Sequence, residues 1–359
     1  MEHILTTLRG QILEATQNHT PLIIRGGSSK DFYGESRRPD NAQILDTRAY
    51  RGITAYDPEE LVISARAGTP LAEIETALAE RNQILPFEPP YFGEGATLGG
   101  AVAAGLAGPR RSHAGAIKDF VLGVKMLNGK GEHLAFGGTV VKNVAGYDVA
   151  KIMAGSLGTL GLITDLSIKV LPKPFAETTL QFEISETEAI AKLNALMGQP
   201  LPLSASFWAD GVLSLRLSGT EAGVQTAVGI IGGLQLEAAA ADALWHSVRE
   251  QTHPAFSLSD TQRLWRVSVP DTASPLPLEG LSAMEWGSGL RWYRTEAKAQ
   301  TIRTAAQQAG GHATLFRGEK HGETVFTPLS EPVEAIHRRL KQTFDPSGIF
   351  NPGRMYPDW

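Results

Sequence analysis

The chain has 359 residues, 33 Lys and Arg against 38 Asp and Glu, a formal net charge of −5 and no cysteine. Without cysteine it can form no disulfide, thiolate zinc site, cysteine nucleophile or iron–sulfur cluster of its own, which favours a cytoplasmic protein. Its mild acidity argues against nucleic acid as a partner. No apolar run approaches the roughly 20 residues of a membrane-spanning helix, so direct membrane insertion is not expected.

The first half of the chain predicts many short elements. Apolar residues at helical spacing predict an amphipathic helix over residues 3–18. Thr69 is a good N-cap and Pro70 suits a first helical position, so a second helix should begin there. Small and apolar residues predict further helices over 97–105 and 144–154. Apolar runs bounded by turn residues predict strands at 21–25, 43–46, 61–65, 120–127, 133–136 and 161–171.

The composition changes at residues 172–174, where Pro-Lys-Pro predicts a domain boundary. Beyond it, strands and helices alternate in a pattern typical of an α+β domain. The strands are predicted over 179–184 and 213–217, and the helices over 186–197, 222–232 and 297–309. A last helix is predicted over 331–343, and the tail after it is too rich in turn and apolar residues for a frayed end.

Glycine is concentrated in one span of the chain. Sixteen of the 38 glycines lie within residues 93–161, interleaved with apolar segments. A disordered stretch would be poor in apolar residues, so these glycines favour close approach of backbone to a ligand or to other backbone. Upstream, residues 25–29 (Arg-Gly-Gly-Ser-Ser) follow a predicted strand. This turn is either a nest of backbone N–H groups that binds an anion or a plain hairpin turn.

Several common motifs are absent from the sequence. It contains no G-x-G-x-x-G, no P-loop, no G-x-S-x-G elbow and no H-E-x-x-H. The nine histidines are scattered without ligand spacing, so no metal site is predicted.

Several blocks together resemble the vanillyl-alcohol-oxidase family of flavoproteins, whose FAD-binding domain is of the p-cresol-methylhydroxylase (PCMH) type. The blocks lie in family order at residues 24–29, 68–71, 96–100, 108–111, 115–120, 142–148, 155–161, 344–346 and 351–355. Each block alone is weak, but together they span nearly the whole chain. Within the family they are similar to the E subunits of bacterial glycolate oxidases.

The resemblance implies an α+β fold. A PCMH-type FAD-binding domain of two subdomains would occupy residues 1–172, with FAD between the subdomains. A smaller α+β cap domain would occupy residues 173–330. The C-terminal helix and tail, residues 331–359, would return to pack on the FAD domain.

The blocks also imply which residues contact FAD. The first loop would hold the pyrophosphate through backbone amides of Ile23, Ile24, Arg25, Gly26, Gly27, Ser28 and Ser29. The ribityl chain and flavin ring would pass Thr97, Gly99, Gly100 and the turn Ala104, Gly105, Leu106, Ala107 and Gly108. The pyrophosphate and adenine side would meet Gly155, Ser156, Gly158, Thr159, Gly161 and Ile163.

The sequence departs from its relatives in ways that affect the chemistry. Its first loop lacks the histidine through which some relatives attach FAD, so the FAD is expected to be non-covalent. Related 2-hydroxy-acid dehydrogenases carry a Gly-Asp-Gly-Asn-x-His type motif that helps to hold metal and substrate, whereas residues 310–314 read Gly-Gly-His-Ala-Thr. Leu157 also replaces a glutamate of those relatives. The weak catalytic candidates are Tyr147, Arg291, which could pair a carboxylate, and His312. A structural role is favoured for Arg291 and His312, and Tyr147 could serve simple packing.

The resemblance implies an FAD-dependent oxidoreductase that works as a subunit of a glycolate oxidase complex, which oxidises the small 2-hydroxy acid glycolate to glyoxylate. Because the chain has no cysteine, electrons that leave its flavin one at a time must reach a quinone, oxygen or a separate iron–sulfur chain. The resemblance implies a D-type flavin subunit and an F-type iron–sulfur subunit as partners. Two alternatives stay open: a self-sufficient 2-hydroxy-acid oxidase or dehydrogenase, and a non-catalytic assembly subunit. The protein is expected in the cytoplasm, with any contact to the inner membrane made through its partners.

Overall fold

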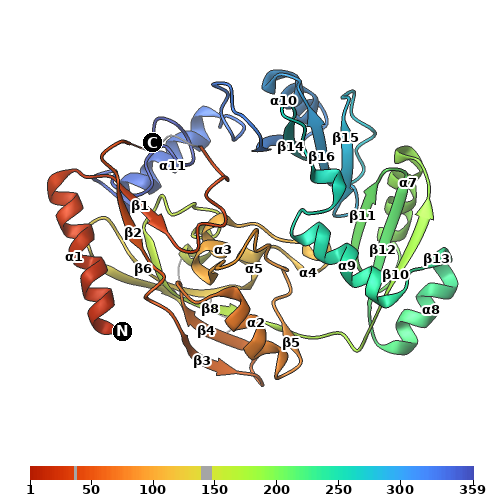
Figure 1. The fold of residues 1–359 in the computed structure, drawn as a ribbon, viewed down its shortest axis with the longest axis horizontal. Coiled ribbons are helices and arrows are strands. Elements are labelled where there is room, and N and C mark those ends of the chain that lie inside the picture. Colours follow the sequence, from red (N-terminus) through yellow and green to blue (C-terminus); the bar gives the residue numbers. More distant parts are fainter. Residues whose placement is uncertain (36–38, 139–147) are drawn as a thin grey trace.

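Two large β-sheets divide the molecule into two halves, as Figure 1 shows. The computed structural model describes residues 1–35, 39–138 and 148–359. The N-terminal half begins with helix α1 (Glu2–Asn18), which confirms the predicted amphipathic helix. Leu8 and Ile12 of α1 are buried against a small parallel sheet formed by β1 (Leu22–Arg25) and β2 (Gln43–Asp46).

A five-stranded antiparallel sheet forms the base of this half. Its strand order is β3 (Ile53–Asp57), β4 (Val62–Arg66), β8 (Leu162–Lys169), β6 (Val121–Leu127) and β7 (His133–Gly137). One face packs against the helices α2 (Leu71–Ala79), α3 (Leu98–Ala104), α5 (Ile117–Phe120) and α6 (Val149–Ile152). The short helix α4 (Arg111–Ala114) follows α3 and leads towards the second half.

An eight-stranded antiparallel sheet forms the second half. Its strand order is β13 (Leu234–Gln235), β10 (Ala176–Glu183), β12 (Val212–Gly219), β11 (Leu203–Ala209), β15 (Leu281–Glu285), β16 (Leu290–Thr295), β14 (Arg263–Ser268) and β17 (His312–Arg317). The outer face packs on the helices α7 (Glu186–Met197), α8 (Glu221–Ile231) and α10 (Ala299–Gln308). The inner face packs on α9 (Ala238–Arg249) and the short 3₁₀ helix Pro254–Phe256, and it meets the first half.

The sequence predicted the helices on the outer face of this half but did not predict most of its strands. Strand β11 is buried along nearly its whole length, and β14 is mostly buried. Strands covered on both faces lose the alternation of apolar and polar residues on which strand prediction depends. The predicted helix over 144–154 lies partly outside the described residues, and α6 covers only four of its positions.

The C-terminal segment returns to the N-terminal half. Helix α11 (Glu331–Phe344) leads into a tail that runs beside β1, where Leu22 and Phe350 form a parallel bridge. The N–H of Leu22 donates to the carbonyl of Ile349 (2.7 Å), and the N–H of Asn351 donates to the carbonyl of Leu22 (2.9 Å). The short pair β5 (Gln83–Ile84) and β9 (Leu171–Pro172) closes the first half. The membership of the sheets supports domain boundaries near 172 and 330, which stay a prediction.

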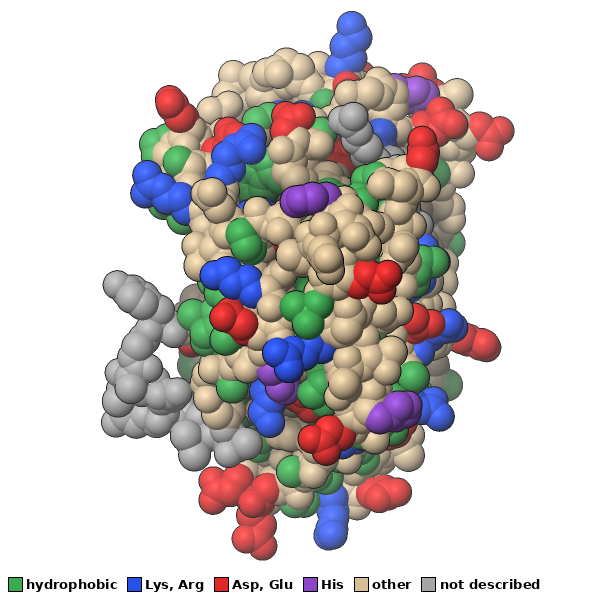
Figure 2. All heavy atoms as spheres, turned by 90° about the vertical axis from the view of Figure 1, so that its left-hand side faces the viewer, with side chains coloured by type: hydrophobic (Ala, Val, Ile, Leu, Met, Phe, Trp, Pro, Cys, Tyr) green, Lys and Arg blue, Asp and Glu red, His purple; other side chains and the backbone are tan. Residues whose placement is uncertain are grey.

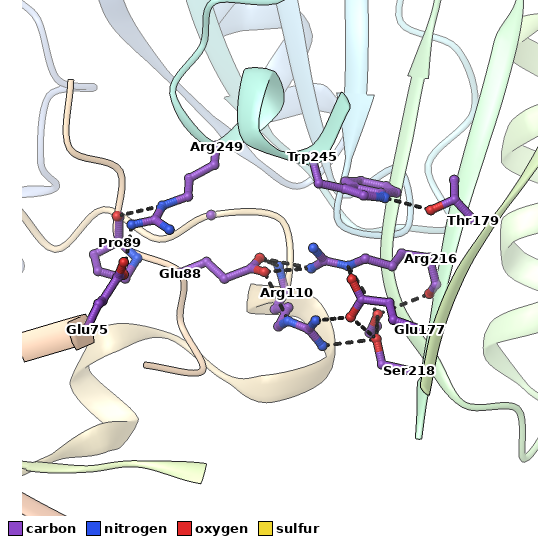
Figure 3. A network of polar contacts seen from close by, with 12 residues as sticks. Glu75, Glu88, Pro89, Arg110, Glu177, Thr179, Arg216, Ser218, Trp245 and Arg249 are labelled. Atoms are coloured by element: carbon purple, nitrogen blue, oxygen red, sulfur yellow. Dashed lines mark hydrogen bonds and ion pairs between the residues drawn. The ribbon is translucent and has the colours of Figure 1, made fainter. Parts of the chain in front are cut away.

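A network of ion pairs joins the two halves (Figure 3). Glu88, in the loop after β5, contacts Arg110 (Nε–Oε1, 3.0 Å) and Arg216 of β12 (Nη2–Oε1, 2.9 Å). Arg110 also pairs with Glu177 of β10. Burial raises the pKa of Glu88, but Arg216 and Arg110 outweigh that effect and lower it below its ordinary value. The network therefore fixes the eight-stranded sheet over the loops of the first half.

The surface does not gather charge of one sign on the side nearest α1. Figure 2 shows acidic and basic side chains interspersed on this face, in keeping with the small net charge. In the part of the chain that the structure describes, no helix is long and apolar enough to cross a bilayer.

Candidate functional site

The loop after β1 presents unpaired backbone donors. In the described part of the chain, the N–H groups of Gly26, Gly27, Ser28 and Ser29 donate to no protein acceptor. Ser28 has a positive φ of 61°, so the loop carries a left-handed residue among free amides. Successive N–H groups in such a conformation converge and form an anion-binding nest. The nest is therefore favoured over the plain hairpin turn that the sequence left open.

The glycines of this loop are needed for contact with neighbouring backbone. A Cβ on Gly27 would lie 1.7 Å from the carbonyl oxygen of Gly95, and one on Gly26 would lie 2.5 Å from Oγ1 of Thr97. The loop thus rests directly on the segment that leads into α3. Side chains at 26 and 27 would lift it away and disperse the free amides.

Positive charge flanks the same loop. Arg25 pairs with Asp31 (Nη2–Oδ2, 3.1 Å), while its buried Nε has no hydrogen-bond partner among the described residues. Lys30 donates from Nζ to the carbonyl of Tyr91 (3.3 Å). Burial lowers the pKa of Lys30 to about 8, with Glu250 opposing the shift, so it remains largely charged near pH 7. Free amides and two cations suit a pyrophosphate, which is the doubly charged part of FAD.

One cavity gathers many of the predicted cofactor residues. Its predicted members are Ile24, Arg25, Gly26, Gly27, Ser28, Ser29, Thr97, Gly100 and Ala104. The sequence did not assign its other members: Lys30, Asp31, Ala103, Leu157, Asn351 and Arg354. These residues come from β1, α3, the loop after α6 and the C-terminal tail.

Asn351 is the residue that ties these segments together. Its Oδ1 accepts from the N–H of Ile24 (2.9 Å), and its Nδ2 donates to the carbonyl of Leu157 (2.6 Å). A Cβ on Gly158 would lie 2.6 Å from that Nδ2, so the glycine makes room for the amide. The Asn-Pro-Gly block at 351–353 was the available signal for Asn351, but its structural partners lie far away in sequence.

Other predicted cofactor residues do not line this cavity. Gly99 donates to the carbonyl of Ala67 (2.8 Å), and its missing side chain makes room for the Cβ of Ala67. Gly161 packs in the same way against Met126. The remaining residues outside the cavity are Ile23, Gly105, Leu106, Ala107, Gly108, Gly155, Ser156, Gly158, Thr159 and Ile163. Of these, five residues are buried within the protein: Ile23, Leu106, Ser156, Thr159 and Ile163.

The turn after α3 meets the eight-stranded sheet at a second cavity. Leu106, Ala107 and Gly108 line it together with Trp286, in the turn between β15 and β16. The indole N–H of Trp286 donates to the carbonyl of Gly108 (3.1 Å). Trp286 has a φ of 57°, an uncommon conformation for a bulky residue, so the turn is held in a strained form that keeps the indole on Gly108.

The catalytic candidates from the sequence lie elsewhere. Arg291 is fully buried and donates to the carbonyls of Ala273, Ser274 (2.7 Å) and Ser288 (3.2 Å), so its guanidinium is already used structurally. The prediction that Arg291 could pair with the carboxylate of a substrate is therefore wrong in this structure. His312 begins β17 at an exposed position and lines neither cavity. Tyr147 lies outside the described residues.

Comparisons with known proteins agree with this geometry. A family model described as an FAD binding domain matches residues 7–150. The chain is 48% identical over 348 residues to glycolate oxidase subunit GlcE of Escherichia coli (strain K12), covering 97% of this chain and 96% of that protein. Glycolate oxidase subunit GlcD of Bacillus subtilis (strain 168) is 27% identical over 182 residues, covering 51% of this chain and 38% of that protein.

Solved structures confirm the predicted α+β fold class. An alkyldihydroxyacetonephosphate synthase superposes with a TM-score of 0.65 at 15% identity, covering 96% of this chain and 74% of that one. At this identity the likeness concerns the fold alone. The extent of the match to the E. coli subunit decides the family, and the FAD binding domain match decides the cofactor. The chain belongs to the glycolate oxidase subunit GlcE family and carries an FAD-binding domain.

Proposed function

We propose that this chain is the FAD-binding subunit of a glycolate oxidase complex and takes part in the oxidation of glycolate to glyoxylate. The free amides of Gly26, Gly27, Ser28 and Ser29 are the observation that carries the proposal, because they form a ready site for the pyrophosphate of FAD. When bound, FAD supplies the two-electron chemistry. The likeness to the E. coli GlcE subunit supports the substrate and the place in a complex.

Different residues around the nest would contact different parts of FAD. Arg25 and Lys30 would balance the negative charge of the pyrophosphate. The turn 104–108 would face the flavin ring, because it lies between the first cavity and the eight-stranded sheet. The FAD would be held without a covalent bond, since the loop 25–30 has no histidine.

The partners follow from the electron balance. This chain has no cysteine to ligate an iron–sulfur cluster, so an iron–sulfur route for electrons from its flavin would run through other subunits. A D-type flavin subunit and an F-type iron–sulfur subunit would supply that route, and the likeness to GlcD fits a shared ancestry of two flavin subunits.

The visible spectrum of the purified full-length chain tests this proposal. We expect flavin absorption bands, either as isolated or after addition of FAD and removal of the excess. Absence of bands under both conditions would refute a redox role and favour an assembly subunit. Reduction of the bound flavin by glycolate without partner subunits would favour the self-sufficient enzyme over an electron relay.

A further inference from the structure

We propose that Arg266 and Glu285 form a binding subsite for a small 2-hydroxy acid, in which Arg266 pairs with the carboxylate and Glu285 accepts the hydroxyl proton. The inference rests on the proposed function, because FAD against the turn 104–108 must act as the oxidant. It assigns to this subunit a substrate contact of its own rather than the role of a relay alone.

The two side chains line one cavity from β14 and β15, the strands on either side of β16. Arg266 lies opposite Trp292 in the pairing of β14 with β16, and Glu285 lies opposite Leu290 in the pairing of β15 with β16. Leu290 and Trp292 are two residues apart, so all four residues share the inner face of the sheet. The opposite wall of the cavity is the turn 104–108, at Leu106 to Gly108. The subsite therefore faces the place proposed for the flavin ring.

Glu285 is a buried carboxyl with an incomplete set of partners. It is 5% exposed, and its Oε1 accepts from the indole N–H of Trp292 (2.8 Å). No other hydrogen bond to this carboxyl is formed within residues 1–35, 39–138 and 148–359, which leaves Oε2 for a ligand. Oε2 is not among the fully buried side-chain atoms that lack a partner, and Glu285 lines the cavity, so this oxygen is open to a ligand there.

The charges around Glu285 suit a group that exchanges a proton near neutral pH. Burial raises the pKa of Glu285 to about 7, while the bond from Trp292 and the charge of Arg266 oppose the rise and Glu88 adds to it. Arg249, from the end of α9, also lines the cavity. A general base is most effective when its pKa lies close to the working pH.

Arg266, which is partly exposed, differs in its partners from Arg263 and Arg216, two buried arginines of the sheet. Arg263, on the same strand, pairs with Glu323 (2.5 Å), and Arg216 pairs with Glu88. Within the described residues no carboxylate forms a hydrogen bond or ion pair with Arg266, whose guanidinium carbon lies 5.1 Å from the ring centre of Trp286. A planar guanidinium held by an indole offers two parallel donors to a carboxylate.

The chemistry balances with these two residues and the oxidant named. The O–H bond of the 2-hydroxy acid breaks and its proton goes to Glu285. The C–H bond of the same carbon breaks and its hydrogen leaves with both electrons to the oxidised FAD. The C–O bond becomes a carbonyl, which gives the 2-oxo acid, while Arg266 keeps the carboxylate in place throughout.

Equilibrium binding of oxalate to the full chain loaded with FAD tests whether Arg266 binds the carboxylate of the acid. Oxalate resembles the acid but has no C–H bond to break, so binding is measured without turnover. We expect Arg266→Met to weaken oxalate binding at least tenfold, while Glu285→Gln binds oxalate as well as the unaltered chain or better. FAD content is measured first in every variant.

The pH dependence of anaerobic flavin reduction tests whether Glu285 accepts the proton of the hydroxyl group. We expect the rate with glycolate or D-lactate to rise with pH through an apparent pKa near 7, as Glu285 loses its proton. Glu285→Gln should lower the rate by about 10²- to 10⁴-fold and remove this pH dependence. Glu186→Gln is the matched control, because burial also raises the pKa of Glu186 but its helix α7 covers the outer face of the sheet.

The outcomes separate the two proposals. Full FAD content with oxalate binding unchanged in Arg266→Met would overturn the subsite and leave the FAD-binding function standing. An unaltered pH profile in Glu285→Gln would likewise overturn the role of Glu285 as base. Failure of the unaltered chain to bind FAD would instead refute the proposed function itself.

Discussion

Removal of the Glu88 carboxylate should destabilise the protein more than removal of any exposed charge. In Glu88→Ala, Arg110 loses its partners at Oε1 and Oε2, and Arg216, whose side chain is 4% exposed, loses its shortest ion pair. Breaking a buried pair costs about 3–5 kcal/mol. Because Glu177 remains 3.9 Å from Nε of Arg216, we expect the lower end of that range, about 3 kcal/mol.

Thermal unfolding of the purified protein, followed by circular dichroism, measures this loss. At about 2 °C per kcal/mol, Glu88→Ala should lower Tm by about 6 °C. Glu334→Ala is the control, since its exposed pair with Arg338 (2.7 Å) should contribute only about 0.3–0.5 kcal/mol. Equal shifts in the two variants would refute the reasoning that the network fixes the two halves together.

The same network predicts an acid-sensitive contribution to stability. The folded pKa of Glu88 lies below its ordinary value, so its contribution is present above that ordinary value and is lost as pH falls through the folded pKa. Glu88→Ala should therefore flatten the acid side of the stability profile, whereas Glu334→Ala should leave it unchanged.

Three further predictions concern the FAD site. Asn351→Ala leaves the N–H of Ile24 and the carbonyl of Leu157 without their partners, so it should cost about 2–4 kcal/mol in urea unfolding; a loss below 1 kcal/mol would contradict the role of Asn351. Arg25→Met should weaken FAD binding about tenfold in a fluorescence titration, whereas Arg48→Met, which removes an exposed pair, should not change it. Acid precipitation should leave the yellow colour in the supernatant; colour retained by the protein would show a covalent bond.

The sequence was most informative where function depends on local backbone. A strand followed by Gly-Gly-Ser-Ser indicated a possible nest, and the free amides of residues 26–29 agree with it. The sequence alone could not decide between nest and hairpin turn, because that choice depends on whether other segments supply acceptors. Only the packed structure shows that Gly95 and Thr97 hold the loop without capping its amides.

The sequence was less informative where glycine serves packing. Gly99 and Gly161 were predicted to contact FAD, yet Ala67 and Met126 fill the space beside them. A glycine pattern does not distinguish room for a ligand from room for a neighbouring side chain. Arg291 illustrates the same limit, since the carbonyls that hold its guanidinium come from the loop after β14 and the turn between β15 and β16, neither of which has a recognisable motif.

The residues of the proposed acid subsite could not be found by spacing. Arg266 and Glu285 lie on strands that the sequence did not predict, and they meet only because β14, β16 and β15 are neighbours in the sheet. Burial, rather than any motif, is what gives Glu285 its raised pKa.

In the proposed function, the free amides of residues 26–29 hold the pyrophosphate of FAD. The most direct measurement is a fluorescence titration of the flavin-free protein with FAD and with riboflavin, repeated in the presence of inorganic pyrophosphate. We expect FAD to bind at least 100-fold more tightly than riboflavin, and pyrophosphate to compete with FAD. Equal affinity for both flavins, with no competition by pyrophosphate, would contradict the account.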